Sequence, residues 1–159
     1  MWQLIIGFYL YNLFEYFIHF ISHCKYNSYL KYYHLLHHKK SYPITKLLDY
    51  APYKSDRYAF LSFGPYILCY AGVLYYTFKL NDGIIIISEN VILLLISDHL
   101  HTNYHIKGSY LEKYKWFLIK RELHFNHHKK LNTNYSLGGI TYVFDKIFGT
   151  YNRINEVNS

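Results

Sequence analysis

The twenty residues that follow the first methionine strongly limit what this chain can fold into. Residues 2–21, WQLIIGFYLYNLFEYFIHFI, contain one charged side chain, Glu15. A helix rises about 1.5 Å per residue, so a run of this length covers about 30 Å, the thickness of the hydrocarbon layer of a bilayer. The basic stretch and the small-residue cleavage site of a secretory signal do not flank it. The run therefore predicts a membrane-spanning helix.

Two further apolar segments predict a helical hairpin. Residues 58–78 are uncharged and long enough to span a bilayer. Residues 84–97 are shorter and contain Glu89, but with Leu80 and residues 98–100 they make a second arm, and KLNDG at 79–83 is typical of the turn between the arms. The predicted fold class is an all-α integral membrane protein with about three transmembrane helices.

The distribution of positive charge predicts the topology. Of the 17 Lys and Arg residues, seven lie in 24–57 and nine in 98–159, which leaves only Lys79 on the other side of the membrane. Positive charge collects on the cytoplasmic side. We therefore expect a cytoplasmic helical cap built from these two segments, within a single domain of residues 1–159. Topology also accounts for the net charge of +7, so no nucleic-acid role is expected.

Ten of the 11 histidines fall into four clusters with helical spacing. Two clusters are H-x-x-x-H pairs and two are H-x-x-H-H triads. Residues three and four apart share a face of a helix, so each cluster is expected to aim its rings at one point. All four clusters lie on the cytoplasmic side of the predicted topology. They are His19 and His23; His34, His37 and His38; His101 and His105; and His124, His127 and His128.

This many imidazoles predicts two metal ions. A zinc site closes with four ligands, whereas ten nitrogens suit two ions with about five each and a position left open. Imidazole binds Fe, Zn, Cu and Ni alike, so the ligands do not choose the metal. We expect Glu15 to accept a hydrogen bond from the ring of His19, and Asp98 from that of His101; the alternative is that these carboxylates only reach the membrane interface.

The order of the four clusters around a membrane hairpin resembles the fatty acid hydroxylase/sterol desaturase superfamily of membrane di-iron oxygenases. The stretches EYFIHFISH at 15–23, DHLHTNYH at 98–105, KGSYL at 107–111 and FDKIFGTY at 144–151 look most like the fatty acid 2-hydroxylases. The likeness covers about residues 12–153. NYSLGG at 134–139 would lie near the metal ions in a role that the resemblance leaves undefined.

The resemblance implies the chemistry of the site. The ten clustered histidines would bind two Fe ions, with Zn an alternative in a purified sample, and no catalytic residue beyond these ligands is assigned. The reaction would use O2 and electrons from a separate donor, a b-type cytochrome and its reductase. The substrate would be a membrane lipid, and the protein would lie in the endoplasmic reticulum or an equivalent membrane with the metal site on the cytoplasmic side.

The expected activity is hydroxylation at carbon 2 of a fatty acyl chain, whether free, CoA-linked or part of an N-acyl sphingolipid. One alternative is a sterol oxidase, desaturase or carotenoid hydroxylase that uses the same centre. The other is an inactive metal-binding membrane scaffold.

Overall fold

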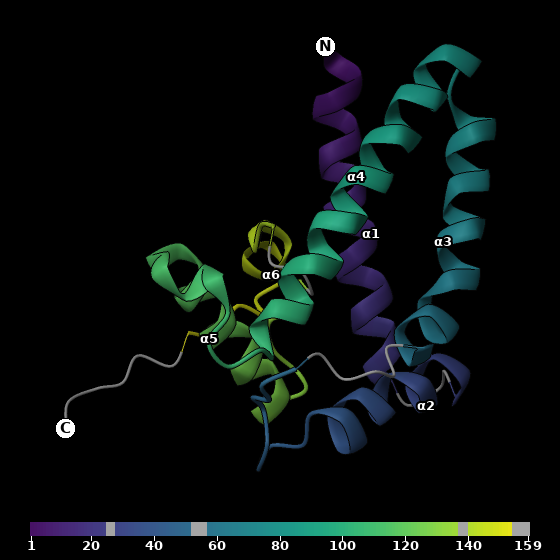
Figure 1. Ribbon diagram of the computed structural model, residues 1–159. Coiled ribbons are helices and arrows are strands. Elements are labelled where there is room, and N and C mark those ends of the chain that lie inside the picture. The colour runs from purple at the N-terminus through teal and green to yellow at the C-terminus, as the bar shows by residue number, and fades with distance from the viewer. Residues whose placement is uncertain (25–27, 52–56, 137–139, 154–159) are drawn as a thin grey trace.

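The computed structural model describes residues 1–24, 28–51, 57–136 and 140–153, and these residues form helices without a strand. Three long helices, α1 (Trp2–His23), α3 (Arg57–Thr77) and α4 (Leu80–Tyr104), stand beside one another (Figure 1). The N-terminus and the α3–α4 turn lie at one end of them. Near the other end are α2 (Ser28–Leu36), a π-helical turn η1 (His37–Ser41), the 3-10 turn η2 (Tyr110–Lys113), α5 (Lys115–Lys129) and α6 (Val143–Ile147).

Two of the described helices, α1 and α4, are long and apolar enough to cross a membrane. The first matches the expected span at 2–21, and the second contains the expected arm, which was 84–97 with Leu80 and residues 98–100, and runs further to Tyr104. A crossing by α3, and hence three spans in all, stays a prediction. So does the cytoplasmic orientation of the other helices.

The expected turn at 79–83 is wrong in extent. Lys79 precedes the first residue of α4, so Asn81, Asp82 and Gly83 are helical. Asp82 suits the first turn because a carboxylate there interacts favourably with the positive end of the helix dipole. Gly83 lies close to the preceding helix, where an added Cβ would be 3.7 Å from the Leu74 carbonyl oxygen. The hairpin is therefore tighter than its polar residues suggest.

A buried asparagine joins the three long helices. Asn90 of α4 donates from Nδ2 to the Gly7 carbonyl of α1 (3.1 Å), and its Oδ1 accepts from the Tyr70 hydroxyl of α3 (2.8 Å). The Tyr70 ring also stacks on Phe14, with centroids 4.2 Å apart. Because apolar surroundings offer such groups no water, each hydrogen bond holds two helices in register.

A buried arginine fixes α5 against the end of α4. Arg121 donates from Nη2 to the main-chain carbonyls of Asn103 (3.0 Å) and Ile106 (2.9 Å), and from Nη1 to Glu112 (2.7 Å). The last carbonyls of a helix have no intrahelical partner, so a cation there stabilises the helix end. The contact sets the position of the second histidine triad, on α5, relative to the second pair, on α4.

The close approach of α1 and α4 depends on Gly7. A Cβ at this position would collide with the Glu89 carboxylate and would lie 3.3 Å from Asn90 Nδ2, whereas a Cβ at Gly72 of α3 would meet nothing within 4 Å. We expect Gly7→Leu to lower the free energy of unfolding by about 1–3 kcal/mol, the usual cost of overpacking. Thermal unfolding in detergent, with Gly72→Leu as the matched control, measures the difference. Equal melting temperatures for the two variants would contradict the packing described.

Candidate dimetal site

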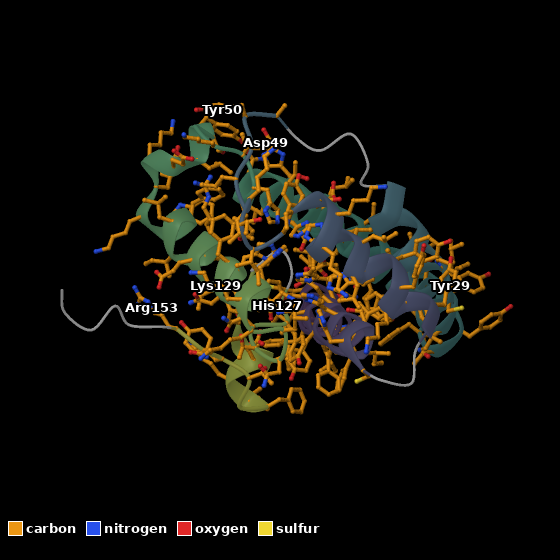
Figure 2. All side chains as sticks on the ribbon, turned by 90° about the horizontal axis from the view of Figure 1, so that it is seen from below. Tyr29, Asp49, Tyr50, His127, Lys129 and Arg153 are labelled. Atoms are coloured by element: carbon orange, nitrogen blue, oxygen red, sulfur yellow. The ribbon has the colours of Figure 1, made fainter. Side chains whose placement is uncertain are left out.

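The four histidine clusters meet where α1, α2, α4 and α5 come together. Figure 2 looks along the long helices from this end, and His127 lies among the closely spaced side chains between α5 and the ends of α1 and α2. Ring nitrogens gather there in two groups, and the nitrogens within each group lie within 4.8 Å of one another. The first group is His19, His23, His34, His38 and His127, and the second is His37, His101, His105 and His124.

The tenth histidine, His128, lies beside the second group. Its Nε2 is 3.1 Å from His124 Nε2, and its ring packs against that of His105 with centroids 4.9 Å apart. The structure thus brings together all ten histidines that the spacing selected. His99 is exposed, outside both groups, and its Nε2 is 2.9 Å from the Tyr110 hydroxyl.

Each triad divides its histidines between the two groups, which corrects the expectation of one point per cluster. In the first triad the outer positions, His34 and His38, face the first group and the middle one, His37, faces the second. On a helix with 3.6 residues per turn, positions i and i+4 are about 40° apart, while i+3 lies about 60° to the other side of i. The second triad divides in the opposite sense, with His127 in the first group and His124 in the second.

The first group is oriented by two main-chain carbonyls. His19 Nδ1 is 2.6 Å from the Tyr135 carbonyl oxygen, and His127 Nδ1 is 2.6 Å from that of Thr133. A carbonyl only accepts, so both Nδ1 atoms carry the proton and both Nε2 atoms present a lone pair to the group. There His19 Nε2 lies 3.0 Å from His34 Nε2, and His127 Nε2 lies 3.1 Å from His23 Nε2.

The second group is oriented in the same way by the segment that follows the first triad. His105 Nδ1 is 2.8 Å from the Leu47 carbonyl oxygen, and His128 Nδ1 is 3.1 Å from that of Tyr42. His124 Nε2 lies between their Nε2 atoms, 2.9 Å from that of His105 and 3.1 Å from that of His128. The segment itself is fastened beyond the end of α4, because Asp49 N donates to the His105 carbonyl (2.8 Å) and Lys107 N donates to that of Asp49 (2.7 Å).

Two of the inward nitrogens have no protein partner in the part of the chain that the structure describes, and the whole set suits a cation. His37 Nε2 and His101 Nε2 are buried and have no hydrogen-bond partner among the described residues. A buried polar atom without a partner costs about 1–3 kcal/mol, and lone pairs that face one another add repulsion. A metal ion in each group would accept all of these lone pairs at once.

Protonation of the histidine rings does not take the place of a metal ion near pH 7. Burial, and then repulsion from neighbouring imidazoles, hold the pKa values of His34, His37 and His124 well below the usual range. Burial also lowers the pKa of His127 to about 4. The rings are therefore neutral near pH 7, which is the form that binds a metal.

Glu15 does not take the position expected of it. Its Oε1 accepts from the Tyr11 hydroxyl (3.3 Å) and from Ser97 Oγ, so it links α1 to α4 within the helix interface. The His19 nitrogen expected to bond to it is bonded to the Tyr135 carbonyl instead. Asp98 is exposed, and its expected bond to His101 stays a prediction.

Asp145 is a residue of the site that sequence reasoning missed. Its side chain is fully buried, and it accepts from Tyr135 N (2.6 Å), Ser136 N (3.1 Å), Ser136 Oγ (2.5 Å) and Thr150 Oγ1 (2.8 Å). These bonds fix the loop whose Tyr135 carbonyl orients His19. The quoted stretches NYSLGG and FDKIFGTY contain these residues, but a single sequence does not show that the two stretches bind each other.

Metal-free protein is expected to lose stability as the pH falls from about 6.5 towards 4. The pKa of His127 is about 4 when folded, against 6.5 for a free histidine. Between these values the unfolded chain binds more protons than the folded chain, so the free energy of unfolding falls with the pH. Thermal unfolding of chelator-treated protein, with the exposed-residue variant His99→Gln as control, measures this. A melting temperature that stays constant or rises on acidification would contradict it.

Asp145→Asn should disturb the first group and spare the second. One Asp145 oxygen would become an NH2 group facing the donors of residues 135, 136 or 150, a mismatch that costs about 1–3 kcal/mol. The Tyr135 carbonyl would then leave His19, and the metal content per chain should fall by up to half. Metal analysis of purified protein measures this against Asp82→Asn, which keeps an acceptor oxygen for Gln3. Equal loss from both groups, or from neither, would contradict the assignment.

The histidine geometry agrees with the comparison of the chain with known families. The model of the fatty acid hydroxylase family matches residues 4–150, a stretch that contains all ten histidines of the site. No curated protein and no solved structure matches the chain. Because the family match covers almost the whole sequence, the chain belongs to the fatty acid hydroxylase family.

Proposed function

We propose that this protein is a membrane-bound, O2-dependent hydroxylase that introduces a hydroxyl group at carbon 2 of a fatty acyl chain, with two iron ions bound by ten histidines. The family supports the coarser function of a membrane lipid hydroxylase, and α1 and α4 with this family indicate membrane association. The observation that carries the assignment of two metal ions is the pair of converging groups of ring nitrogens, and iron is the metal that the family resemblance implies. The proposed acyl substrate is a free, CoA-linked or N-acyl sphingolipid chain.

The residues present fit two metal ions. The first group offers five nitrogens and the second offers four, with His128 beside it. Such ligand numbers leave room for an open position on an ion that takes six ligands. When bound, two iron ions supply the activation of O2 that lets one oxygen atom enter a C–H bond while the other leaves as water, at the expense of two electrons and two protons.

The chain contributes orientation and a dry environment to this chemistry. The carbonyls of Tyr42, Leu47, Thr133 and Tyr135 hold ring N–H groups, so each of the four bonded rings keeps its lone pair on the metal side. Burial of the rings excludes water, which would otherwise compete for the open positions. The Phe63 and Tyr135 rings border the first group. The ring centroids of Phe63 and His34 are 5.7 Å apart, and those of Tyr135 and His19 are 5.8 Å apart.

A hollow between the long helices supports an apolar substrate. Its cavity volume is about 50 Å³, and its lining is almost entirely carbon. Tyr11 and Phe14 line it from α1, eight and five residues before His19, together with residues of α3 and α4. An alkyl chain is the kind of ligand that such a lining binds.

The proposal includes a separate electron donor, a b-type cytochrome with its reductase, in the endoplasmic reticulum or an equivalent membrane. The sequence contains no dinucleotide-binding glycine fingerprint. Lys39 and Lys40 follow the first triad, Lys129 and Lys130 follow the second, and all four are exposed. A positive surface so close to the metal groups suits an acidic donor, and it suits the cytoplasmic side of the membrane.

Lipid analysis of a host that expresses the chain tests the proposal. Wild-type protein should yield lipids one oxygen atom heavier, with the hydroxyl at carbon 2 of the acyl chain. His37→Ala removes a ligand of the second group and His127→Ala one of the first, so both should reduce the product to background and lower the metal content. His99→Gln, the variant of the exposed histidine, should keep both at the wild-type level.

The same measurement separates the alternatives. Lipids that lose two hydrogen atoms and gain no oxygen would identify a desaturase, and a hydroxylated sterol or carotenoid would identify another substrate class. Metal content without oxygen consumption would identify a scaffold. Metal content and lipid profile that are unchanged in both triad variants would overturn the proposed site.

A further inference from the structure

The helical part beyond the spans carries a surface that is too apolar for water. Four large side chains of η2 and the start of α5 are exposed, namely Tyr110 (61%), Tyr114 (42%), Trp116 (44%) and Leu118 (45%). On α6 and directly after it, Ile147 (64%) and Phe148 (47%) are exposed as well. We call these six residues the apolar rim. Groups of exposed aromatic and aliphatic side chains on a folded surface are typical of interaction sites.

Both parts of the apolar rim reach back along the apolar helices, past the level of the metal groups. The Tyr110 hydroxyl is 2.9 Å from His99 Nε2, five residues or about 8 Å before the end of α4. The Phe148 ring packs on those of Tyr16 and Phe17, with centroids 5.0 and 5.4 Å away. In Figure 1 the start of α5 and the whole of α6 stand at the height of the lower halves of α1 and α4, not beneath their ends.

The charges around the rim match those of lipid headgroups. Lys113 and Lys115 are exposed between the aromatic side chains, and Lys113 Nζ lies 5.0 Å from the centre of the Tyr114 ring. The acid of this turn, Glu112, is paired with Arg121 at 2.7 Å, so the lysines supply the exposed charge of the turn itself. Asp98, beside His99 on α4, is exposed as well. Aromatic rings with interspersed lysines are typical of segments that lie at the boundary between headgroups and acyl chains.

We propose that the apolar rim lies in the membrane interface, with its aromatic and aliphatic side chains among the first acyl carbons and Lys113 and Lys115 at anionic phosphates. The occupant of this surface is the bilayer itself. The rim adjoins α1 through Phe148 and α4 through Tyr110, and its placement would put the metal groups at the level of the headgroups. It does not depend on which reaction the metal groups perform.

The two tryptophans of the chain allow a direct test. Trp2→Phe leaves Trp116 as the only tryptophan, and Trp2, at the start of α1, is distant from the site. In nanodiscs, lipids brominated near the carbonyl end of the acyl chain should quench Trp116, and aqueous iodide should have little effect. Trp116→Phe leaves Trp2, at the N-terminal end of α1, as the only tryptophan. The quenching of Trp2 by brominated lipid then serves as the reference value for a residue at the membrane interface.

A tryptophan on the water-exposed side supplies the matched control. Tyr50 is 77% exposed and lies beyond the end of α4, next to the Asp49–Lys107 bonds. With Trp2→Phe and Trp116→Phe present, the tryptophan introduced by Tyr50→Trp should respond to iodide and not to brominated lipid. In the Trp2→Phe protein, Lys113→Gln with Lys115→Gln should weaken the quenching of Trp116 by brominated anionic lipid more than that by brominated neutral lipid.

Three results would overturn the proposal. Quenching of Trp116 by iodide alone would place the rim in water. Resistance to both quenchers would mean that another protein surface, such as a second copy of the chain, covers it. Identical profiles for Trp116 and for the Tyr50→Trp control would show that the rim has no special relation to the lipid.

Discussion

Four hydrogen bonds between histidine Nδ1 atoms and main-chain carbonyls decide what this protein can do. A neutral imidazole has two tautomers, and only the one with its proton on the outer nitrogen presents a lone pair to the interior. The carbonyls of Tyr42, Leu47, Thr133 and Tyr135 impose that tautomer on His128, His105, His127 and His19. All four carbonyls lie outside helices, where no intrahelical hydrogen bond competes for them. The loops after the two triads therefore orient the ring nitrogens that the proposed metal ions would contact.

The surrounding packing keeps these loops and helices in place. Asn90 and Gly7 set the approach of α1 to α4, which brings the His19 pair near the His101 pair. Arg121 fastens α5 to the end of α4, and Asp145 fastens the 134–136 loop. The π-helical turn at His37–Ser41 directs the chain out of the first triad, with Tyr42 N bonded to the His37 carbonyl at 2.8 Å. Each of these contacts joins segments that are distant in sequence or that leave regular helix.

The sequence predicted the three long helices and the convergence of the clustered histidines, because both depend on local periodicity. An apolar run of twenty residues or an H-x-x-H-H spacing can be recognised without knowledge of the rest of the chain. The division of each triad between two groups was not predicted, although it too follows from helix geometry, because it depends on where the neighbouring helices lie. The role of Glu15 was wrong because the Tyr135 carbonyl occupies the position at His19 that its carboxylate was expected to take. Every residue type has a main-chain carbonyl, so the amino-acid identities of Thr133 and Tyr135 could not reveal that their carbonyls accept hydrogen bonds from histidine rings. Asp145 was missed for a related reason, since its partners are mostly main-chain N–H groups and nearby hydroxyls.

During synthesis, most histidines of the first group are made well before the main-chain carbonyls that orient two of its rings. Four of the five rings in the first group come from residues 19–38, but the carbonyls that orient His19 and His127 come from residues 135 and 133. A ribosome delivers the amino-terminal rings long before it delivers those carbonyls. Until then the early histidines remain free to rotate and to exchange tautomers. The bonded orientation of His19 and His127 therefore exists only once residues 133 and 135 have been added to the chain.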